Sequence, residues 1–366
     1  MQTKTFFVIS LLTLAVLWWV CLQFIFVFGP EAVKRAIQST ERVVFVTSSN
    51  LESEPGIRVL DANNPFFEVL RQEPNRIDVK WEDTKIESEE ATCRLKKSDG
   101  PLVRVMARLN GRQYPMVIDS GCGLNLVVND VVVKEHQLEI FPFEFPDSTL
   151  AGFCRVDKLE IGNMTISNPP CAYTLNHYEK RVLGRTKWKE RQILFGLGLL
   201  HRFRYFLIDN VASEVEFGMR ESFQADPLYM WGQYRMSIET TKRNARNLMI
   251  HTTIAGEETK ARLDTGTNWS LALSQNVWSK LSTELHVLNE SRGQARFFHG
   301  WNDINTITVA ELSVGDKCMT NTPIVVLNDT VFGENFILIG MDYFKDTVIV
   351  IDFEHSLLWV RKPEPL

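Results

Sequence analysis

Two short triplets hold the residues of this sequence that are best suited to acid–base chemistry. Asp119-Ser120-Gly121 and Asp264-Thr265-Gly266 each place a carboxyl group directly before a hydroxyl residue and a glycine. Two carboxyls held about 3 Å apart cannot both ionise, so such a pair keeps one proton and combines an acid with a base. The pair can activate a water molecule and protonate a carbonyl oxygen. Such a pair could carry out hydrolysis without a metal ion or a cofactor, and its titration would belong to the pair rather than to either residue.

A single triplet of this kind carries little information, because Asp before Ser or Thr and Gly is common in ordinary turns. Here the two triplets end two similar segments, LVRVMARLNGRQYPMVIDSG and LMIHTTIAGEETKARLDTG. Each segment reads as an alternating strand, a turn and a second strand that runs into the aspartate. Asp119 and Asp264 lie 145 positions apart, and the turn glycines Gly111 and Gly256 have the same spacing. The triplets therefore occupy equivalent points of an internal repeat.

Later landmarks repeat almost in step. Leu194-Phe195-Gly196 follows Asp119 after 77 positions, and Leu338-Ile339-Gly340 follows Asp264 after 76. Asp209 and Asp352 also correspond, but each lies in a terminal strand outside a triplet, so we interpret them as structural. Two units built mostly of short strands with Gly, Pro and Asn turns predict an all-β protein of two lobes, 99–225 and 226–366.

The combination resembles the aspartic peptidases. It is similar to the pepsin-like enzymes in having two lobes on one chain, and to the retropepsins in the brevity of each lobe. The resemblance covers about residues 100 to 362 and implies an aspartic endopeptidase with Asp119 and Asp264 as its catalytic pair. It also implies a peptide or protein substrate held between the lobes and an active site that is complete within a monomer.

Six further residues are expected to support the catalytic loops. Gly121 and Gly266 permit a tight turn beside each carboxyl, and Ser120 and Thr265 are placed to form hydrogen bonds between the lobes. The resemblance implies that Gly196 and Gly340 cross beneath the two loops. The flap is expected at Gly152 and Phe153 in the first lobe and at Gly300 and Trp301 in the second. Cys122 departs from the family pattern, and we interpret it as a tolerated small side chain rather than a redox-sensitive group.

The N-terminal part predicts attachment to a membrane. After a tail of residues 1–5, the 23 residues from Phe6 to Phe28 carry no charge, and a helix of that length spans about 34 Å. No small-residue cleavage site follows, so an uncleaved signal-anchor is favoured over a signal peptide. Charges flank both ends of this run, and only the short tail favours an extracytoplasmic location for the lobes. Residues 29–98 are expected to form a polar stalk with one strand at Ile77–Trp81.

Composition excludes one class and leaves one alternative open. The net charge is −5, which gives no electrostatic footprint for nucleic acid. The six cysteines form no C-x-x-C pair, so a structural zinc site is not expected, and Cys154 and Cys171 are favoured as free thiols over a disulfide. The alternative to an enzyme is a catalytically inactive peptidase-fold module that binds peptides or a protein partner at the membrane.

Overall fold

The computed structural model describes residues 40–60, 84–142, 150–182, 185–240, 246–297, 300–329 and 333–362. They fall into two compact units, a smaller one that contains residues 40–44, 177–182 and 185–190 and a larger one that contains the other described residues. The apolar run Phe6–Phe28 and the strand expected at Ile77–Trp81 lie outside the described residues. Within the described part of the chain, none of the helices has both the length and the apolar character that crossing a bilayer requires.

The first half of the larger unit forms a ten-stranded sheet in the order β2-β10-β9-β4-β5-β14-β6-β11-β8-β7. Its strands are β2 (Lys85–Ser88), β4 (Arg104–Leu109), β5 (Arg112–Asp119), β6 (Leu126–Asn129), β7 (Ile140–Pro142), β8 (Leu150–Arg155), β9 (Lys158–Ile161), β10 (Met164–Ser167), β11 (Pro170–Thr174) and β14 (Ile193–Gly196). Apolar residues alternate with exposed or partly exposed residues along the strands, so that one face of each strand is buried. In β4 the buried residues are Val105, Ala107 and Leu109. The turn into β5 uses the left-handed conformation at Asn110 and Gly111, as a tight hairpin requires.

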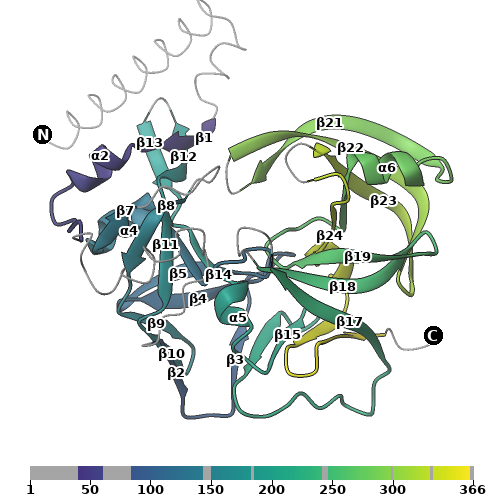
Figure 1. Cartoon of the computed structure of the whole chain (residues 1–366), viewed down its shortest axis with the longest axis horizontal. Helices are drawn as coiled ribbons and strands as arrows, with labels where there is room; N and C mark the ends of the chain where they lie inside the picture. The colour runs from purple at the N-terminus through teal and green to yellow at the C-terminus, as the bar shows by residue number, and fades with distance from the viewer. Residues whose placement is uncertain are drawn as a thin grey trace, which may run out of the picture. The chain divides into compact units, whose positions relative to one another are not determined.

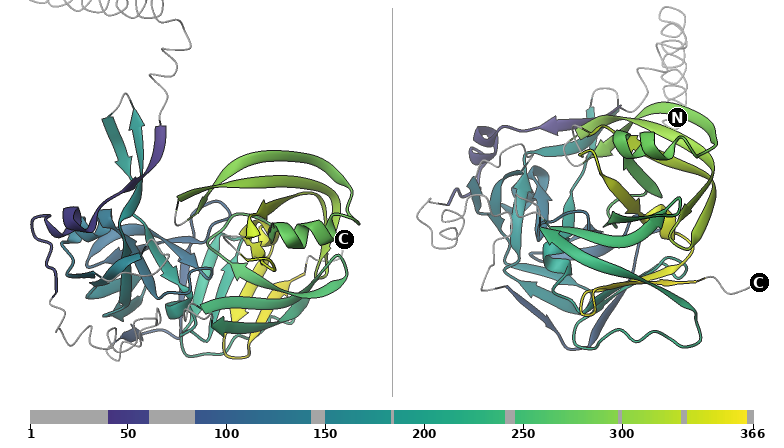
Figure 2. Two further views of the ribbon diagram at one scale, coloured as in Figure 1. Left: turned by 45° about the horizontal axis from the view of Figure 1, so that its top comes forward. Right: turned by 45° about the vertical axis from the view of Figure 1, so that its right-hand side comes forward.

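The second half follows the same plan within a thirteen-stranded sheet, in the order β21-β22-β23-β20-β24-β19-β18-β17-β26-β25-β15-β16-β3. Its strands are β3 (Thr92–Lys96), β15 (Tyr205–Asp209), β16 (Glu214–Gly218), β17 (Trp231–Thr240), β18 (Arg246–Ile254), β19 (Glu257–Asp264), β20 (Leu271–Ser274), β21 (Val287–Phe297), β22 (Gly300–Val314), β23 (Lys317–Leu327), β24 (Ile337–Gly340), β25 (Val348–Asp352) and β26 (Leu357–Arg361). Ala255 and Gly256 repeat the left-handed turn of Asn110 and Gly111. Figure 2 shows the light-green β21–β22 hairpin as a long curved ribbon in both views.

Short helices also occupy equivalent places in the two halves. They are α4 (Asp130–His136) after β6, α6 (Gln275–Leu281) after β20, α5 (Leu197–Leu200) after β14 and the 3-10 helix η2 (Met341–Phe344) after β24. The side chain of Asn129 caps α4, and that of Ser274 caps α6, each by accepting a backbone N–H of the first turn. These caps satisfy N–H groups that would otherwise lack partners.

The two halves are joined by strands that they share. β15, from the end of the first half, pairs antiparallel with β25 from the end of the second, with Tyr205 opposite Asp352. β3 adds to the edge at β16, with Cys93 opposite Phe217. The stretch from β2 to β3 therefore belongs to the sheets and is not a free stalk, and α2 (Ser48–Glu52) forms a further helix upstream.

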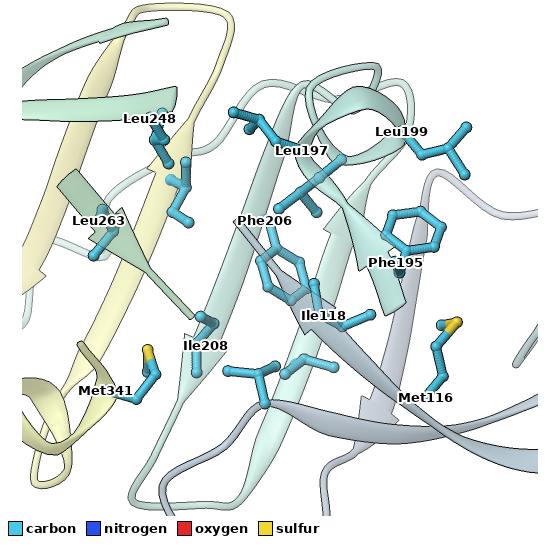
Figure 3. Close-up of a cluster of buried hydrophobic side chains, with 14 of the residues drawn as sticks. Met116, Ile118, Phe195, Leu197, Leu199, Phe206, Ile208, Leu248, Leu263 and Met341 are labelled. Atoms are coloured by element: carbon cyan, nitrogen blue, oxygen red, sulfur yellow. The ribbon is translucent and has the colours of Figure 1, made fainter. Parts of the chain in front are cut away.

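A hydrophobic core runs through both halves of the larger unit. Figure 3 shows Met116 and Ile118 of β5, Phe195 of β14, Phe206 and Ile208 of β15, Leu248 of β18, Leu263 of β19 and Met341 of η2 in one cluster. Ile118 and Leu263 each directly precede a triplet aspartate and are fully buried. Their burial fixes the backbone at the point where each aspartate begins, and contributes about 1.5–3 kcal/mol per side chain.

The smaller unit contains a three-stranded sheet in the order β1-β12-β13. Its strands are β1 (Thr40–Phe45), β12 (Asn176–Val182) and β13 (Arg185–Lys189). β12 and β13 pair antiparallel, with Lys180 opposite Trp188. This sheet was not expected from the sequence, which predicted a stalk at β1.

Candidate active site

The aspartates lie at the ends of two equivalent strands. β5 runs parallel to β14, with Asp119 opposite Gly196, and β19 runs parallel to β24, with Asp264 opposite Gly340. Figure 1 shows the strands of the two sheets converging where β5 and β19 end. The chain therefore brings together two residues that are 145 positions apart in the sequence.

Gly196 and Gly340 pass directly beneath the loops that follow the aspartates. A Cβ on Gly196 would meet the carbonyl oxygens of Leu124 and Cys122, and one on Gly340 would meet the carbonyl oxygen of Trp269. Gly196 N donates to Asn125 O at 2.8 Å, and Leu197 N donates to Cys122 O at 2.7 Å. The backbone approach closes the space in which a side chain would lie, which explains the glycine at both positions.

Hydrogen bonds between Ser120 and Thr265 tie the two loops together. Ser120 N donates to Thr265 Oγ1 at 2.9 Å, and Thr265 N donates to Ser120 Oγ at 3.0 Å. The hydroxyls then donate to the opposite strands, Ser120 to Leu263 O at 2.8 Å and Thr265 to Ile118 O at 2.7 Å. Both side chains are fully buried, so the four bonds fix the relative position of the loops.

The carboxyl groups face each other at close range. Each packs against the glycine of the opposite triplet, because a Cβ on Gly121 would overlap Asp264 and one on Gly266 would overlap Asp119. Cys122 N donates to Asp119 Oδ1 at 3.0 Å, and Gly266 N donates to Asp264 Oδ1 at 2.8 Å. These donors orient the carboxyls and hold one oxygen of each in place.

Electrostatics keeps a proton on the pair. Burial and the charge of Asp264 raise the pKa of Asp119 to about 8, and a side-chain hydrogen bond with Asp264 acts in the same direction. Arg262 and the Cys122 N–H oppose the shift. These effects favour one proton on the pair near neutral pH, so that a carboxylic acid and a carboxylate lie side by side.

Cys122 lies beside the pair as a partly buried free thiol. Burial and the neighbouring Asp119 raise the pKa of this thiol to about 12. Since the thiolate is the reactive form of cysteine, this shift disfavours reaction of the Cys122 side chain near neutral pH. Cys154 and Cys171, opposite each other on β8 and β11, are likewise free thiols and are buried.

The flap residues expected from the sequence differ between the halves. Gly152 and Phe153 lie inside β8, and Phe153 is buried, so they do not form a hairpin tip; residues 143–149, which connect β7 to β8, lie outside the described residues. In the second half Gly300 pairs with Phe297 and Trp301 with Arg296. Gly300 and Trp301 are therefore the first two residues of β22, and residues 298–299 before them lie outside the described residues.

Asp209 and Asp352, which occupy equivalent positions of the repeat outside the triplets, accept hydrogen bonds that stabilise turns. Asp209 Oδ1 accepts from Val211 N at 2.9 Å and from Ala212 N at 2.7 Å. Asp352 is buried and accepts from His355 N at 3.0 Å and from Trp359 Nε1 at 3.2 Å. Both carboxyls hold turns between strands.

One charged residue of the site was missed by the sequence analysis. Arg262 lies two residues before Asp264 on β19, and its Nη2 donates to Gly121 O of the opposite loop. The alternating period of a strand places residues 262 and 264 on one face, and this was the signal that could have identified it. Among the described residues, no group of three His, Cys, Asp or Glu side chains is placed to hold a metal ion.

Comparisons with known proteins support the class of domain. Residues 250–346 match the family described as gag-polyprotein putative aspartyl protease, a segment that contains Asp264 and Gly340. The match supports an aspartic-peptidase-like domain in this chain.

Among solved structures, the crystal structure of conglutin gamma, a unique basic 7S globulin from lupine seeds, matches with a TM-score of 0.41 and 12% sequence identity. The match covers 76% of this chain and 96% of conglutin gamma. No curated protein matches the sequence.

Proposed function

We propose that this chain is an aspartic endopeptidase whose catalytic residues are Asp119 and Asp264. The observation that carries the proposal is the packing of each carboxyl against the glycine of the opposite triplet, together with the raised pKa of Asp119. Two carboxyls that share one proton at the ends of equivalent strands form an acid and a base in one site.

In the proposed reaction the pair acts on a water molecule and the scissile carbonyl at the same time. The ionised carboxyl takes a proton from water, whose oxygen forms a bond with the carbonyl carbon. The protonated carboxyl gives its proton to the carbonyl oxygen, which yields a tetrahedral diol. Collapse of the diol breaks the C–N bond: the carboxyl that now carries the proton gives it to the amide nitrogen, and a diol hydroxyl gives its proton to the other carboxyl, so the pair again holds one proton.

We also propose that the peptidase is held at a membrane by Phe6–Phe28, with its lobes on the extracytoplasmic side. The supporting observation is the uncharged run of 23 residues, long enough to cross a bilayer. A membrane or extracytoplasmic protein is then the expected substrate. Added protease should digest the lobes in right-side-out vesicles without detergent; protection of the lobes there would contradict this orientation.

Removal of either carboxyl tests the reaction. Asp119→Asn and Asp264→Asn should each lower turnover of an extended peptide by several orders of magnitude, and the double variant should be little worse, because residues that act as a unit are not additive. A pepstatin-type inhibitor should block the wild-type activity. Asp209→Asn is the control, since Asp209 holds a turn outside the pair.

The same experiment separates the enzyme from a binding module. A folded chain that binds extended peptides but cleaves none, with or without its aspartates, would support the inactive peptidase-fold alternative. An Asn variant with near-normal turnover would contradict the assignment of the pair.

A further inference from the structure

The strand that leads to Asp264 carries a positive charge on the same face as that aspartate. Lys260, Arg262 and Asp264 alternate along β19 with the buried Ala261 and Leu263, and period-2 alternation places the first three on one side. Lys260 is exposed and pairs with Glu239 at 2.7 Å. Arg262 is half-buried and points toward the other half of the molecule.

Arg262 is committed to the opposite loop. Its Nη2 donates to the carbonyl oxygen of Gly121, the last residue of the other triplet. Its Nε is buried and has no hydrogen-bond partner among the residues that the structure describes. In the same residues it forms no ion pair with a carboxylate within 4.0 Å. A partly buried guanidinium loses hydration, and one hydrogen bond to a neutral carbonyl does not replace it. The position of this charge is therefore unfavourable for stability, which suggests a functional role for Arg262.

The corresponding position of the first half has no charge. Val117 lies opposite Leu194 in the register of β5 and β14, as Arg262 lies opposite Leu338 in that of β19 and β24. The two catalytic strands are therefore asymmetric, since β19 carries a cation at this position and β5 does not. A pair of carboxyls that shares one proton carries one negative charge, and one nearby cation stabilises that charge.

We propose that Arg262 is a positioning residue of the aspartate pair, which clamps the Gly121 carbonyl across the loops and supplies the charge that keeps one of the two carboxyls ionised. Burial and mutual repulsion of the carboxyls both favour protonation of the pair. Without an opposing charge the pair becomes doubly protonated and loses its base. Arg262 offsets that tendency from a position outside direct contact with either carboxylate.

Few charged groups compete with Arg262 for this role. The groups that act on Asp119 are Asp264, Arg262 and the Cys122 N–H, and those that act on the Cys122 thiol are Asp119, Arg262, Asp264 and the Leu124 N–H. β14 and β24, which pair with the two catalytic strands on one side, contribute only Ile, Leu, Phe and Gly. On the other side β4 carries Arg104, opposite Val117, and Arg108, and β18 carries Arg246 and His251, opposite Lys260; none of these four is among the groups that act on Asp119. Arg262 is thus the cation among the groups that act on Asp119.

Three substitutions separate the charge of Arg262 from its hydrogen bond. Arg262→Gln keeps an N–H donor but removes the charge, Arg262→Lys keeps the charge, and Arg262→Met removes both. Lys260→Met is the matched control, because it removes a cation from the same face of the same strand. Each full-length variant is compared with wild type by its pH–rate profile and by the pH titration of its ¹³C-labelled aspartate carboxyls.

The charge-removing variants should move the titration of the pair to higher pH. Loss of a cation near a carboxyl shifts its pKa by about 1–3 units, so Arg262→Gln and Arg262→Met should shift both limbs of the pH–rate profile upward by that amount. kcat should fall on the acidic side while KM changes little, because the proposed role involves the reacting pair and not substrate contacts. Arg262→Lys should restore most of the wild-type profile, and Lys260→Met should leave it unchanged.

The inference rests on the proposed peptidase function, and the carboxyl titration keeps the two distinguishable. If the chain cleaves no peptide while Arg262→Gln still shifts the carboxyl titration, the peptidase proposal fails and the role of Arg262 stands. The role proposed for Arg262 is wrong if peptide cleavage requires both aspartates but Arg262→Gln changes neither the carboxyl titration nor the pH–rate profile. An equal shift in Lys260→Met would also overturn it.

Discussion

Ser120 and Thr265 lie 145 residues apart in the sequence, and each hydroxyl accepts the backbone N–H of the other. Each hydroxyl also donates to a carbonyl of the opposite strand. Because an aspartate directly precedes each of the two residues, the position of one carboxyl relative to the other depends on these four bonds. The pair of loops therefore behaves as one structural unit.

Loss of a hydroxyl from this unit should lower both stability and activity. Thr265→Val keeps the shape of the side chain but leaves the buried Ser120 N–H and Ile118 carbonyl without partners. Each unsatisfied buried group costs about 1–3 kcal/mol, so urea denaturation should give a reduced free energy of unfolding. Turnover should fall as well, since the carboxyls lose their fixed separation.

Thr265→Ser retains the hydroxyl and is the matched control. It should stay close to wild type in turnover and lose only the stability contributed by one methyl group. Ser120→Ala should behave like Thr265→Val. A normal rate in both hydroxyl-free variants would mean that the bonds do not position the carboxyls.

The crossing glycines should tolerate no side chain. In Gly196→Ala the new Cβ meets the backbone oxygen of Leu124, and in Gly340→Ala that of Trp269; backbone atoms cannot move aside as a flexible side chain can. We expect a loss of about 1–3 kcal/mol or more in each variant, measured by urea denaturation. Gly293→Ala is the control, because its Cβ would meet nothing within 4 Å, and its stability should change by less than about 0.5 kcal/mol.

The all-β class and the equivalence of the two triplets could be predicted because both depend on sequence pattern. Alternation along 104–109 and the Asn110-Gly111 turn indicate a hairpin in any context, and the repeat marks Asp119 and Asp264 as equivalent. The position of the flap in the first half could not be predicted this way, because Gly152 lies inside a strand and not at a hairpin tip. In the structure Gly152 has a φ of 151° within β8, next to a register shift in the pairing with β11, and a bulge of this kind also favours glycine.

Non-local pairings account for the remaining differences. β3 is a short strand in which the charged Arg94 and Lys96 flank Leu95. It becomes part of a sheet only through its pairing with β16, which comes much later in the chain. Arg262 was missed for a related reason. Its sequence position gives its face on β19, but the opposite loop that receives its hydrogen bond is determined by the fold.

A single chain should be sufficient for activity. Both triplets and all four bonds between them lie within one chain, unlike an active site assembled from two copies. Specific activity of the detergent-solubilised full chain should therefore stay constant on dilution, and sedimentation should show active monomers. A loss of specific activity that parallels dissociation of a dimer would contradict this.

The raised pKa of Asp119 should make stability depend on pH in one direction. Burial and the charge of Asp264 raise the pKa of Asp119 to about 8 in the folded chain, against the ordinary value of 3.8 when unfolded, so between these values the folded aspartate pair binds more protons than the unfolded chain. The free energy of unfolding contributed by this group is therefore fully present below about pH 4, falls as the pH rises, and is lost above about pH 8. Asp119→Asn cannot ionise, so it should remove this decline and be more stable than wild type at pH 8, although it should be inactive. Urea denaturation at several pH values measures how the free energy of unfolding changes with pH. Asp209→Asn, which lies outside the pair, should show the same pH dependence as wild type. If wild type and Asp119→Asn had the same slope between pH 4 and 8, the aspartate pair would not be held protonated by its surroundings.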